Sequence, residues 1–468
     1  MSDAGREPEA SEQVGTDDRF ASHGRALNAV LVDAILAAVE VGAAQRLAEL
    51  LEPLHAADIA DLLEQIGAQS RRKLVLLWGD ALDPTTLTEL IEGVRNDIVP
   101  LLSEAQLARL TELETDDVVY IVEDLAQDEQ AKVLDALDEA DRAAVESSLA
   151  YPDYSAGRLM QRELVMAPEP WTVGEMIDHM RAAEDLPDLF YDVIMVDPRM
   201  RPIGTVPLSR VMGNRRDVAL RDLMDADFRT IRPEASQEDV AYDFTQYHMV
   251  SLPVVDAGGR LVGVITVDDA MVAQSEEAEE DMKRLAGVGD EELSDRVWAT
   301  ARLRFPWLAA NLVTAVLASL VISVFEATLD AVIALAVLMP IVASMGGNAG
   351  TQTLTVAVRA LATRDLTGAN MLRVVWREAL VGLLNGLAFA ALTAAIGGLW
   401  FSSVDLALVL AAAMVVNLLV AGLAGILIPV GLDRLGADPA LASGTFVTTV
   451  TDVVGFFAFL GLAAMILL

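Results

Sequence analysis

Cysteine is absent from the 468 residues, which excludes disulfides, thiolate metal ligands and a cysteine nucleophile. Histidine is scarce, and the four histidines (His23, His55, His179 and His248) all precede the first long hydrophobic run. Basic residues are also few: 33 Lys and Arg face 70 Asp and Glu, and the formal net charge of −37 lies almost entirely before residue 301. Such a surface disfavours nucleic acid and anionic lipid as partners and favours cations, although a merely soluble acidic surface gives the same count.

The soluble part begins with a polar tail and continues as a helical region. Residues 1–20 are expected to be disordered because they hold few apolar residues. Residues 21–150 predict a stack of short amphipathic helices, since apolar residues recur at helical spacing and several segments begin with Ser, Thr or Asp at the N-cap position. Most acids here are expected on the solvated surface, and a few are candidates to hold a divalent ion.

An internal repeat marks residues 151–273. The segment Val193–Asp197 recurs 59 residues later as Leu252–Asp256. Each unit mixes short strands with helical stretches and resembles a CBS domain, an α+β module that pairs and often binds adenine nucleotides. In the second unit Thr266 and Asp269 match the ribose-contacting Thr/Ser-x-x-Asp motif of that family and are the candidate nucleotide contacts. The first unit lacks the acid, and many CBS pairs bind no nucleotide, so ATP binding stays open.

Residues 274–304 form a highly charged stretch that is predicted to be an acidic connector helix. Glu277, Glu280 and Asp281 fall on one helix face at i, i+3 and i+4 spacing. Like charges this close destabilise a helix by a few tenths of a kcal/mol each, and a counter-cation would reverse the sign. A solvated linker helix has the same composition, so both interpretations remain.

Hydrophobic segments after residue 304 predict a membrane domain over residues 305–468. Five spans are expected, at about residues 305–325, 331–361, 379–401, 405–430 and 445–468. Arginine occurs before the first span and in the loops after the second and fourth spans. The charged residues in the loops after the first and third spans are all acidic. The positive-inside rule then predicts a plasma (inner) membrane protein whose N-terminal domains are cytoplasmic and whose C-terminus is outside.

The second span is unusual because Gly346, Gly347, Asn348 and Thr351 gather in it. Irregular backbone at membrane depth must line a cavity or pack against protein, and Asn and Thr supply neutral oxygens. This span is therefore predicted to be broken and to form part of a pore or binding element. Helix packing through small residues is the alternative, since Gly346 and Gly350 have GxxxG spacing.

The fifth span holds the single carboxylate that we expect inside a span, Asp452. It shares a helix face with Thr445, Thr448 and Thr449. An uncompensated acid there costs roughly 2.5–3.5 kcal/mol on insertion scales, which favours the wall of a wet path over a buried acid hydrogen-bonded to threonine. Hard oxygen ligands without Cys or His suit Mg²⁺ or Ca²⁺ rather than Cu⁺ or Zn²⁺.

Architecture and motifs together resemble the MgtE family of magnesium channels and transporters. The motifs that carry the resemblance are PIVASMGGNAGTQTLTVAVRALATRDL at 340–366, DPALASGTFVTTVTD at 438–452 and EAEED at 277–281. The resemblance implies a multidomain fold: an all-α helical-repeat N domain, an α+β CBS pair, a connector helix and an α-helical membrane domain with five transmembrane helices. It also implies a homodimer whose ion path lies on the dimer axis, lined by the second and fifth helices.

The resemblance assigns residues of this chain to two roles. The implied ion path comprises Gly346, Gly347, Asn348, Thr351, Thr448 and Asp452, and the chain departs from relatives in having Thr at 351 and 445. The implied regulatory Mg²⁺ ligands are Asp269, Glu277, Glu280, Asp281 and Asp438, with Asp117 as a weaker candidate. Cytosolic Mg²⁺ on these acids would draw the soluble domains together and let the connector helix close the pore.

Magnesium uptake gated by intracellular Mg²⁺ is therefore the predicted function. The alternatives are a transporter of another hard divalent cation (Mn²⁺, Co²⁺ or Ca²⁺) and a non-conducting membrane sensor of Mg²⁺ or nucleotide. A CBS-containing anion channel is disfavoured by the pore acid. An enzyme is disfavoured because the sequence shows no nucleophile–base pair, phosphate-cradling loop or catalytic motif.

Overall fold

The computed structural model describes residues 27–183, 186–187, 189–289, 291, 297–440 and 443–468. The tail predicted at residues 1–20 therefore lies outside the described residues. The chain forms two compact units, Met1–Ala270 and Met271–Leu468, and each has its own hydrophobic cores. The finer division into domains stays a prediction.

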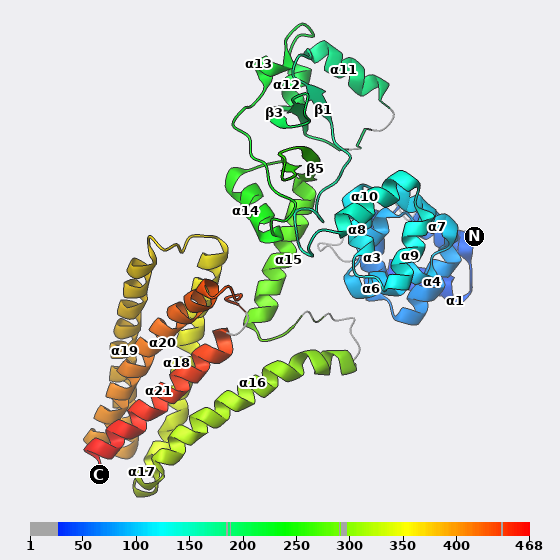
Figure 1. The fold of residues 1–468 in the computed structure, drawn as a ribbon. Coiled ribbons are helices and arrows are strands. Elements are labelled where there is room, and N and C mark those ends of the chain that lie inside the picture. The colour runs from blue at the N-terminus through cyan, green and yellow to red at the C-terminus, as the bar shows by residue number, and fades with distance from the viewer. Residues whose placement is uncertain (1–26, 184–185, 188, 290, 292–296, 441–442) are drawn as a thin grey trace, which may run out of the picture. The chain divides into compact units, whose positions relative to one another are not determined.

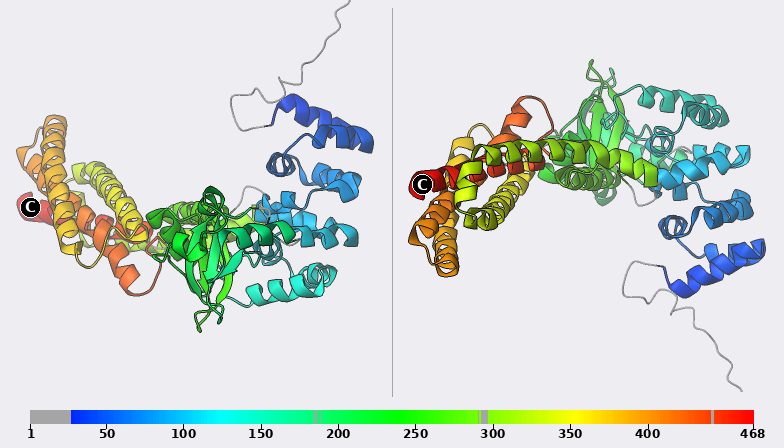
Figure 2. Two further views of the ribbon diagram at one scale, coloured as in Figure 1. Left: turned by 90° about the horizontal axis from the view of Figure 1, so that it is seen from above. Right: turned by 90° about the horizontal axis from the view of Figure 1, so that it is seen from below.

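Short α-helices make up the first part of the first unit (Figures 1 and 2). They are α1 (Ala29–Glu40), α2 (Ala44–Leu51), α3 (Ala56–Gln65), α4 (Ala68–Trp78), α5 (Thr85–Thr88), α6 (Glu92–Ile98), α7 (Glu104–Ala108), α8 (Thr115–Val122), α9 (Gln127–Ala136) and α10 (Glu139–Leu149). Their apolar faces share one core, which confirms the predicted helical stack. Capping boxes set the start of two of them, because His55 pairs with Asp58 and Ser103 pairs with Gln106.

Two α+β modules follow in the same unit. The first contains β1 (Met166–Pro168), α11 (Val173–Ala182), β2 (Asp192–Val196), β3 (Pro202–Pro207), α12 (Leu208–Gly213) and α13 (Leu220–Leu223), and the second contains α14 (Gln237–Tyr247), β4 (Ser251–Val255), β5 (Leu261–Thr266) and the start of α15 (Val267–Leu285). In the first sheet β1 pairs parallel with β2 and β2 pairs antiparallel with β3, and in the second β4 pairs antiparallel with β5.

The repeat is visible down to its turns. Asp197 Oδ1 accepts hydrogen bonds from the backbone N–H groups of Arg199 and Arg201, and Asp256 Oδ1 accepts the same pair from Gly258 and Arg260. In both hairpins the pairing register also shifts between the last two residues of the strand that precedes this aspartate. The predicted CBS-like duplication is thereby confirmed.

Long helices dominate the second unit (Figure 1). Beyond α15 they are α16 (Val297–Val324), the short α17 (Glu326–Ala331), α18 (Ala334–Ala362), α19 (Met371–Phe401), α20 (Val404–Arg434) and α21 (Ser443–Ile466). Among the described residues five helices are long and apolar enough to cross a membrane, which confirms the predicted number of spans. The third begins eight residues earlier than expected, at Met371.

The prediction that the second span is broken at its glycines was wrong. Helix α18 is continuous from Ala334 to Ala362, so its glycines do not interrupt it, although Pro340 inside the helix lacks the N–H that would bond to the Ala336 carbonyl. The glycines are needed for close packing instead. A Cβ on Gly346 would collide with the Asn417 side chain, and a Cβ on Gly350 would lie 2.5 Å from Val447 Cγ1. The small-residue alternative therefore explains Gly346 and Gly350, but not the polar side chains between them.

Candidate ion pathway and regulatory acids

One face of α18 is polar. Ser344, Asn348, Thr351 and Thr355 follow each other at helical spacing, and all are exposed in the chain. Asn348 Nδ2 donates to Ser344 Oγ (3.5 Å), while the Thr351 hydroxyl donates to the Gly347 carbonyl (2.9 Å). These bonds run along the helix, so the oxygen lone pairs stay available on its surface. Lipid cannot satisfy such a face, which needs water, an ion or another protein surface.

The threonines of α21 do not bond to its acid. The Thr448 hydroxyl donates to the Gly444 carbonyl (3.0 Å), and the Thr449 hydroxyl donates to the Thr445 carbonyl (2.6 Å). Asp452 is half-buried, and no group within the described part of the chain donates a hydrogen bond to its carboxylate. This disfavours the alternative of an acid held by threonine and leaves a carboxylate that can attract a cation.

Helices α18 and α21 meet where their polar residues lie. A Cβ on Gly347 would lie 3.8 Å from the Thr448 methyl carbon, in ordinary van der Waals contact. The structure thus brings the predicted path residues Gly347 and Thr448 together. Gly346 instead faces Asn417 of α20, on another side of α18.

Asn417 is a residue that the sequence interpretation missed. It is fully buried, and its Nδ2 donates to the Val342 carbonyl (2.7 Å) across the α18–α20 contact. Gly346 and Gly455 leave the space that its side chain fills. The sequence does contain an indication of this role, because Asn417 is a lone amide in an otherwise apolar span, and such residues often hydrogen-bond between membrane helices.

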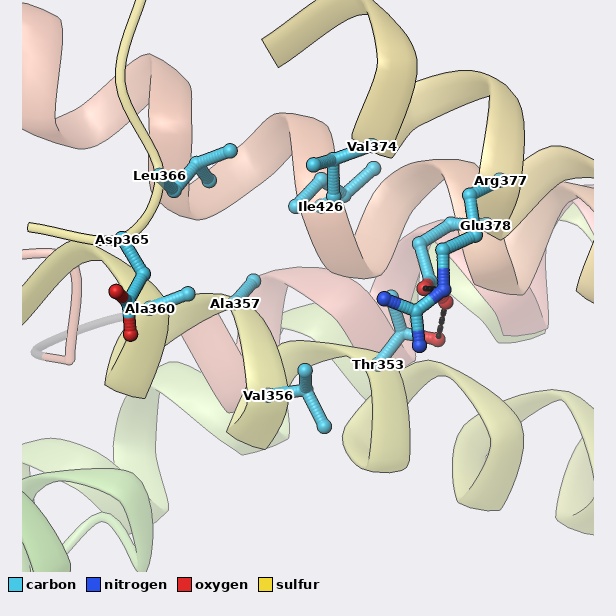
Figure 3. Close-up of a pocket in the computed structure, with 10 residues that line it drawn as sticks. All are labelled: Thr353, Val356, Ala357, Ala360, Asp365, Leu366, Val374, Arg377, Glu378 and Ile426. Atoms are coloured by element: carbon cyan, nitrogen blue, oxygen red, sulfur yellow. Dashed lines mark hydrogen bonds and ion pairs between the residues drawn. The ribbon is translucent and has the colours of Figure 1, made fainter. Parts of the chain in front are cut away.

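Glu378 belongs to a membrane-length helix and not to the loop before the third span. Glu378 is buried on α19, and it was assigned to a loop because the third span was expected to begin at residue 379. The Thr353 hydroxyl of α18 donates to Glu378 Oε2 at 3.4 Å. Figure 3 shows both side chains at one end of a cavity.

The last turns of α15 bring two of the predicted regulatory acids together. Glu280 and Asp438 both form ion pairs with Arg284, whose guanidinium therefore joins α15 to the loop before α21. Helix α15 is the connector helix, but it ends at Leu285 and not at residue 304 as predicted, and α16 begins at Val297. Glu277 and Asp281 are half-buried on α15. Within the described residues, no group of three Asp, Glu or His side chains is already arranged around a metal position. Any ion bound here must share these carboxylates with Arg284 or displace it.

Leu285 follows Arg284 and ends α15 against the transmembrane helices. It packs on a cluster formed by Leu354 and Val358 of α18, Ala440, and Val447 of α21. The Leu285 carbonyl also approaches Gly444, since a Cβ there would lie 3.4 Å from that oxygen. The end of the connector helix therefore abuts the stretch where the threonines of α21 begin.

An acid cluster links α8 to the start of α15 inside the first unit. The predicted ligands Asp117 and Asp269 both belong to it, together with Glu114 and Asp116, which the sequence interpretation did not single out. Asp116 is 6 % exposed and hydrogen-bonds to Asp269, and its Oδ1 atom has no partner among the described residues. Burial, followed by repulsion from neighbouring acids, raises the pKa of Glu114 and of Asp117 to about 7 and raises that of Asp116 well above its usual range.

These raised pKa values predict that the contact between α8 and the start of α15 weakens as the pH rises in Mg²⁺-free buffer. The protonated acids stabilise the fold below about pH 4, and this contribution is lost as pH rises through about 7. We expect faster amide hydrogen exchange in α8 at pH 8 than at pH 5.5, and Mg²⁺ should reverse the change. Asp116→Asn should reduce the pH effect, while Asp128→Asn on the exposed surface of α9 should not. An α8 whose exchange ignores both pH and Mg²⁺, after correction for intrinsic exchange, would contradict the prediction.

The candidate nucleotide contacts point to different neighbours. Thr266 lines a cleft between the two α+β modules with Tyr191, Asp192 and Ser251, and this cleft has a volume of only about 20 Å³. The Thr266 hydroxyl also donates to Asp268 and to Asp269, and Asp269 reaches Asp116. A nucleotide would need the cleft to open and Asp269 to turn away from the acid cluster.

Comparison with known proteins follows the same division of the chain. Family models match residues 54–154 as the MgtE intracellular N domain, residues 220–276 as a CBS domain and residues 339–462 as an MgtE divalent cation transporter. The magnesium transporter MgtE of Thermus thermophilus is 32 % identical over 441 residues, which cover 92 % of this chain and 97 % of that protein. The chain belongs to the MgtE family.

Other MgtE relatives extend the comparison. The magnesium transporter MgtE of Enterococcus faecalis is 33 % identical over 69 % of this chain and 71 % of its own length. A crystal structure of the cytosolic domain of the Mg²⁺ channel MgtE in complex with ATP is 28 % identical, with a TM-score of 0.48, over 52 % of this chain and 99 % of that one. Both curated relatives are named magnesium transporters, and the family resemblance predicted from the sequence is confirmed. The predicted multidomain fold is confirmed by the helical first part, the two α+β modules and the five membrane-length helices.

Proposed function

We propose that this chain carries Mg²⁺ across the plasma membrane into the cytoplasm, along a path lined by α18 and α21. Membership of the MgtE family and five membrane-length helices support transport. The observation that carries the path is the contact of α18 and α21 beside Asp452, whose carboxylate receives no hydrogen bond within the described residues. We propose no catalytic activity.

The proposed path recognises Mg²⁺ largely through its water shell. Mg²⁺ gives up water reluctantly and binds one or two carboxylates in most protein sites. Asp452 supplies the charge, and Asn348, Thr351 and Thr448 supply neutral oxygens that can bond to the ion's waters. Gly347 lies against the Thr448 methyl group, so the two helices are close enough at this point for one ion to meet both.

A second copy of the chain is proposed to complete the path. The polar face of α18 is uncovered among the described residues, and a homodimer with the path on its axis would place two such faces around the ion. The N-terminal domains are proposed to be cytoplasmic, in accord with the intracellular N domain match, and the C-terminus is proposed to lie outside.

Cytosolic Mg²⁺ is proposed to close this path through both ends of α15. At its start Asp269, with Asp117 and Asp116, forms the acid cluster whose repulsion a divalent ion would relieve. At its end Glu280 and Asp438 pair with Arg284, next to Leu285, which packs against α18 and α21. Glu277 and Asp281 lie on the preceding turns of the same helix. Mg²⁺ on these acids would hold this end of the helix in place, and its loss would release it. ATP binding at Thr266 stays a separate hypothesis.

Growth of a magnesium-auxotrophic host tests the cargo. Cells that make the protein should grow at low external Mg²⁺, and cells with an empty vector should not. Uptake measured in the presence of Ca²⁺, Mn²⁺ or Co²⁺ distinguishes Mg²⁺ from the other divalent cations that the family description allows. Absence of rescue, with the protein shown to be in the membrane, would contradict the proposal and favour a sensor without conduction.

A further inference from the structure

A cavity of about 190 Å³ lies between α18, α19 and α20 (Figure 3). Its walls are mostly apolar and include Val356, Ala357, Ala360, Leu366, Val374 and Ile426. Its polar groups lie at the two ends, with Thr353, Arg377 and Glu378 at one and Asp365 at the other. The volume exceeds the ~30 Å³ share of one liquid water several-fold, so the cavity has room for a larger group.

Glu378 is held only weakly by its partners in this cavity, the Thr353 hydroxyl and the Arg377 guanidinium, whose Nε lies 3.9 Å away. Only 9 % of the residue is exposed, and its bond from the Thr353 hydroxyl is long, at 3.4 Å. Close packing of α19 on α20 fixes its backbone, since a Cβ on Gly422 would lie 2.9 Å from the Glu378 carbonyl oxygen. Burying an acid in this way is costly unless a cation or N–H donor meets it.

Arg377 stands next to Glu378 but in a different environment. Its side chain is 72 % exposed, against 12 % for Glu378, and its Nε lies 3.9 Å from Glu378 Oε1. The cavity thus presents a positive group at its mouth and a negative group inside. A simple cation would match only the inner charge, and a simple anion only the outer one. A zwitterionic ligand matches both.

This pair lies close to the boundary between the lipid headgroups and the hydrocarbon core. Helix α19 has 31 residues, about 46 Å of helix, whereas the hydrocarbon core is about 30 Å thick. About 8 Å therefore remains at each end, and Glu378 lies only about 10 Å from the start of the helix at Met371. Trp376 is 64 % exposed beside the pair, as expected of an aromatic side chain at a membrane interface.

We propose that this cavity binds the headgroup of an aminophospholipid. The primary ammonium donates hydrogen bonds to Glu378, the phosphate accepts from Arg377, and the apolar walls cover the carbon chain next to them. A choline headgroup lacks N–H donors, and a glycerol headgroup leaves Glu378 without a cation, so both should bind less well. The site is separate from the proposed ion path, because Thr353 lies on the side of α18 opposite Thr351 and Thr355.

Native mass spectrometry of the full-length protein tests the proposal. The purified protein is mixed with equal amounts of phosphatidylethanolamine, phosphatidylcholine and phosphatidylglycerol, and bound lipid is counted. We expect about a tenfold preference for phosphatidylethanolamine, which Glu378→Gln should abolish. Arg377→Gln should weaken binding of phosphatidylethanolamine too, and this exposed site should tolerate the change without loss of folding. Arg373→Gln, on the same helix but outside the cavity lining, is the matched control.

Three results would overturn the proposal. Equal binding of the three lipids by the wild type would show that the cavity does not distinguish between their headgroups. Preference for phosphatidylglycerol would show that basic residues at the membrane surface attract the anionic lipid and that Glu378 does not select the headgroup. An unchanged preference for phosphatidylethanolamine in Glu378→Gln would show that this lipid binds outside the cavity. None of these readouts depends on Mg²⁺ transport.

Discussion

Asp452→Asn is expected to reduce Mg²⁺ uptake by cells to less than about one tenth of the wild-type initial rate. A divalent ion about 5 Å from the carboxylate, with a water between them, gains about 6–7 kcal/mol at an effective dielectric constant of ~20. Losing even a third of this weakens ion binding by more than about tenfold. Asparagine keeps the shape of the side chain, so α21 should pack as before. Asp452→Ala should have the same effect.

Asp405→Asn is the matched control for this prediction. It removes one carboxylate from the exposed first turn of α20, outside the polar stretches of α18 and α21. It should leave uptake close to wild type, and both variants should reach the membrane in similar amounts. Wild-type uptake by Asp452→Asn would move the ion path away from α21 and contradict the assignment.

Glu280→Ala combined with Asp281→Ala should keep the path open at cytosolic Mg²⁺ concentrations that close the wild type. Two carboxylates would be lost from the face of α15 that precedes Leu285, and Arg284 would keep only Asp438 as an ion-pair partner among those described. Divalent ions should then no longer fix the end of α15. Uptake by cells preloaded with Mg²⁺ measures the effect, and the double variant should continue to take up Mg²⁺ after the wild type has stopped.

Glu279→Ala provides the control on the same helix. Glu279 is exposed and pairs with Lys283, away from Arg284 and Asp438. Its loss should leave closure unchanged. If the double variant closed at the same Mg²⁺ concentration as Glu279→Ala and the wild type, the connector helix would not be the sensor.

The sequence predicted features that depend on local pattern. Hydrophobic length predicted five spans, and a repeated strand pattern predicted the duplicated α+β module with its Asp197 and Asp256 turns. Asp452 stood out because a carboxylate in an apolar span is costly wherever the helix packs. The continuity of α18 was missed because glycine predicts either irregular backbone or close packing, and only the side chain of Asn417 on another helix decides between them.

The remaining residues depend on contacts that spacing does not reveal. Arg284 joins Glu280 to Asp438, and Asp438 lies 154 residues after Arg284 in the chain. Asp116 becomes buried only because α8 packs beside Asp269. Glu378 looked like a loop residue until the start of α19 was known. In each case tertiary packing, and not local sequence, determines what a charged side chain meets.

Mg²⁺ influx into liposomes that contain only the purified protein tests the central claim most directly. A Mg²⁺-sensitive dye inside the liposomes would report the initial rate after Mg²⁺ is added outside. The account predicts rapid influx with the wild type, the same influx with Asp405→Asn and almost none with Asp452→Asn. Equal influx with all three proteins, or none with a correctly folded wild type, would contradict it.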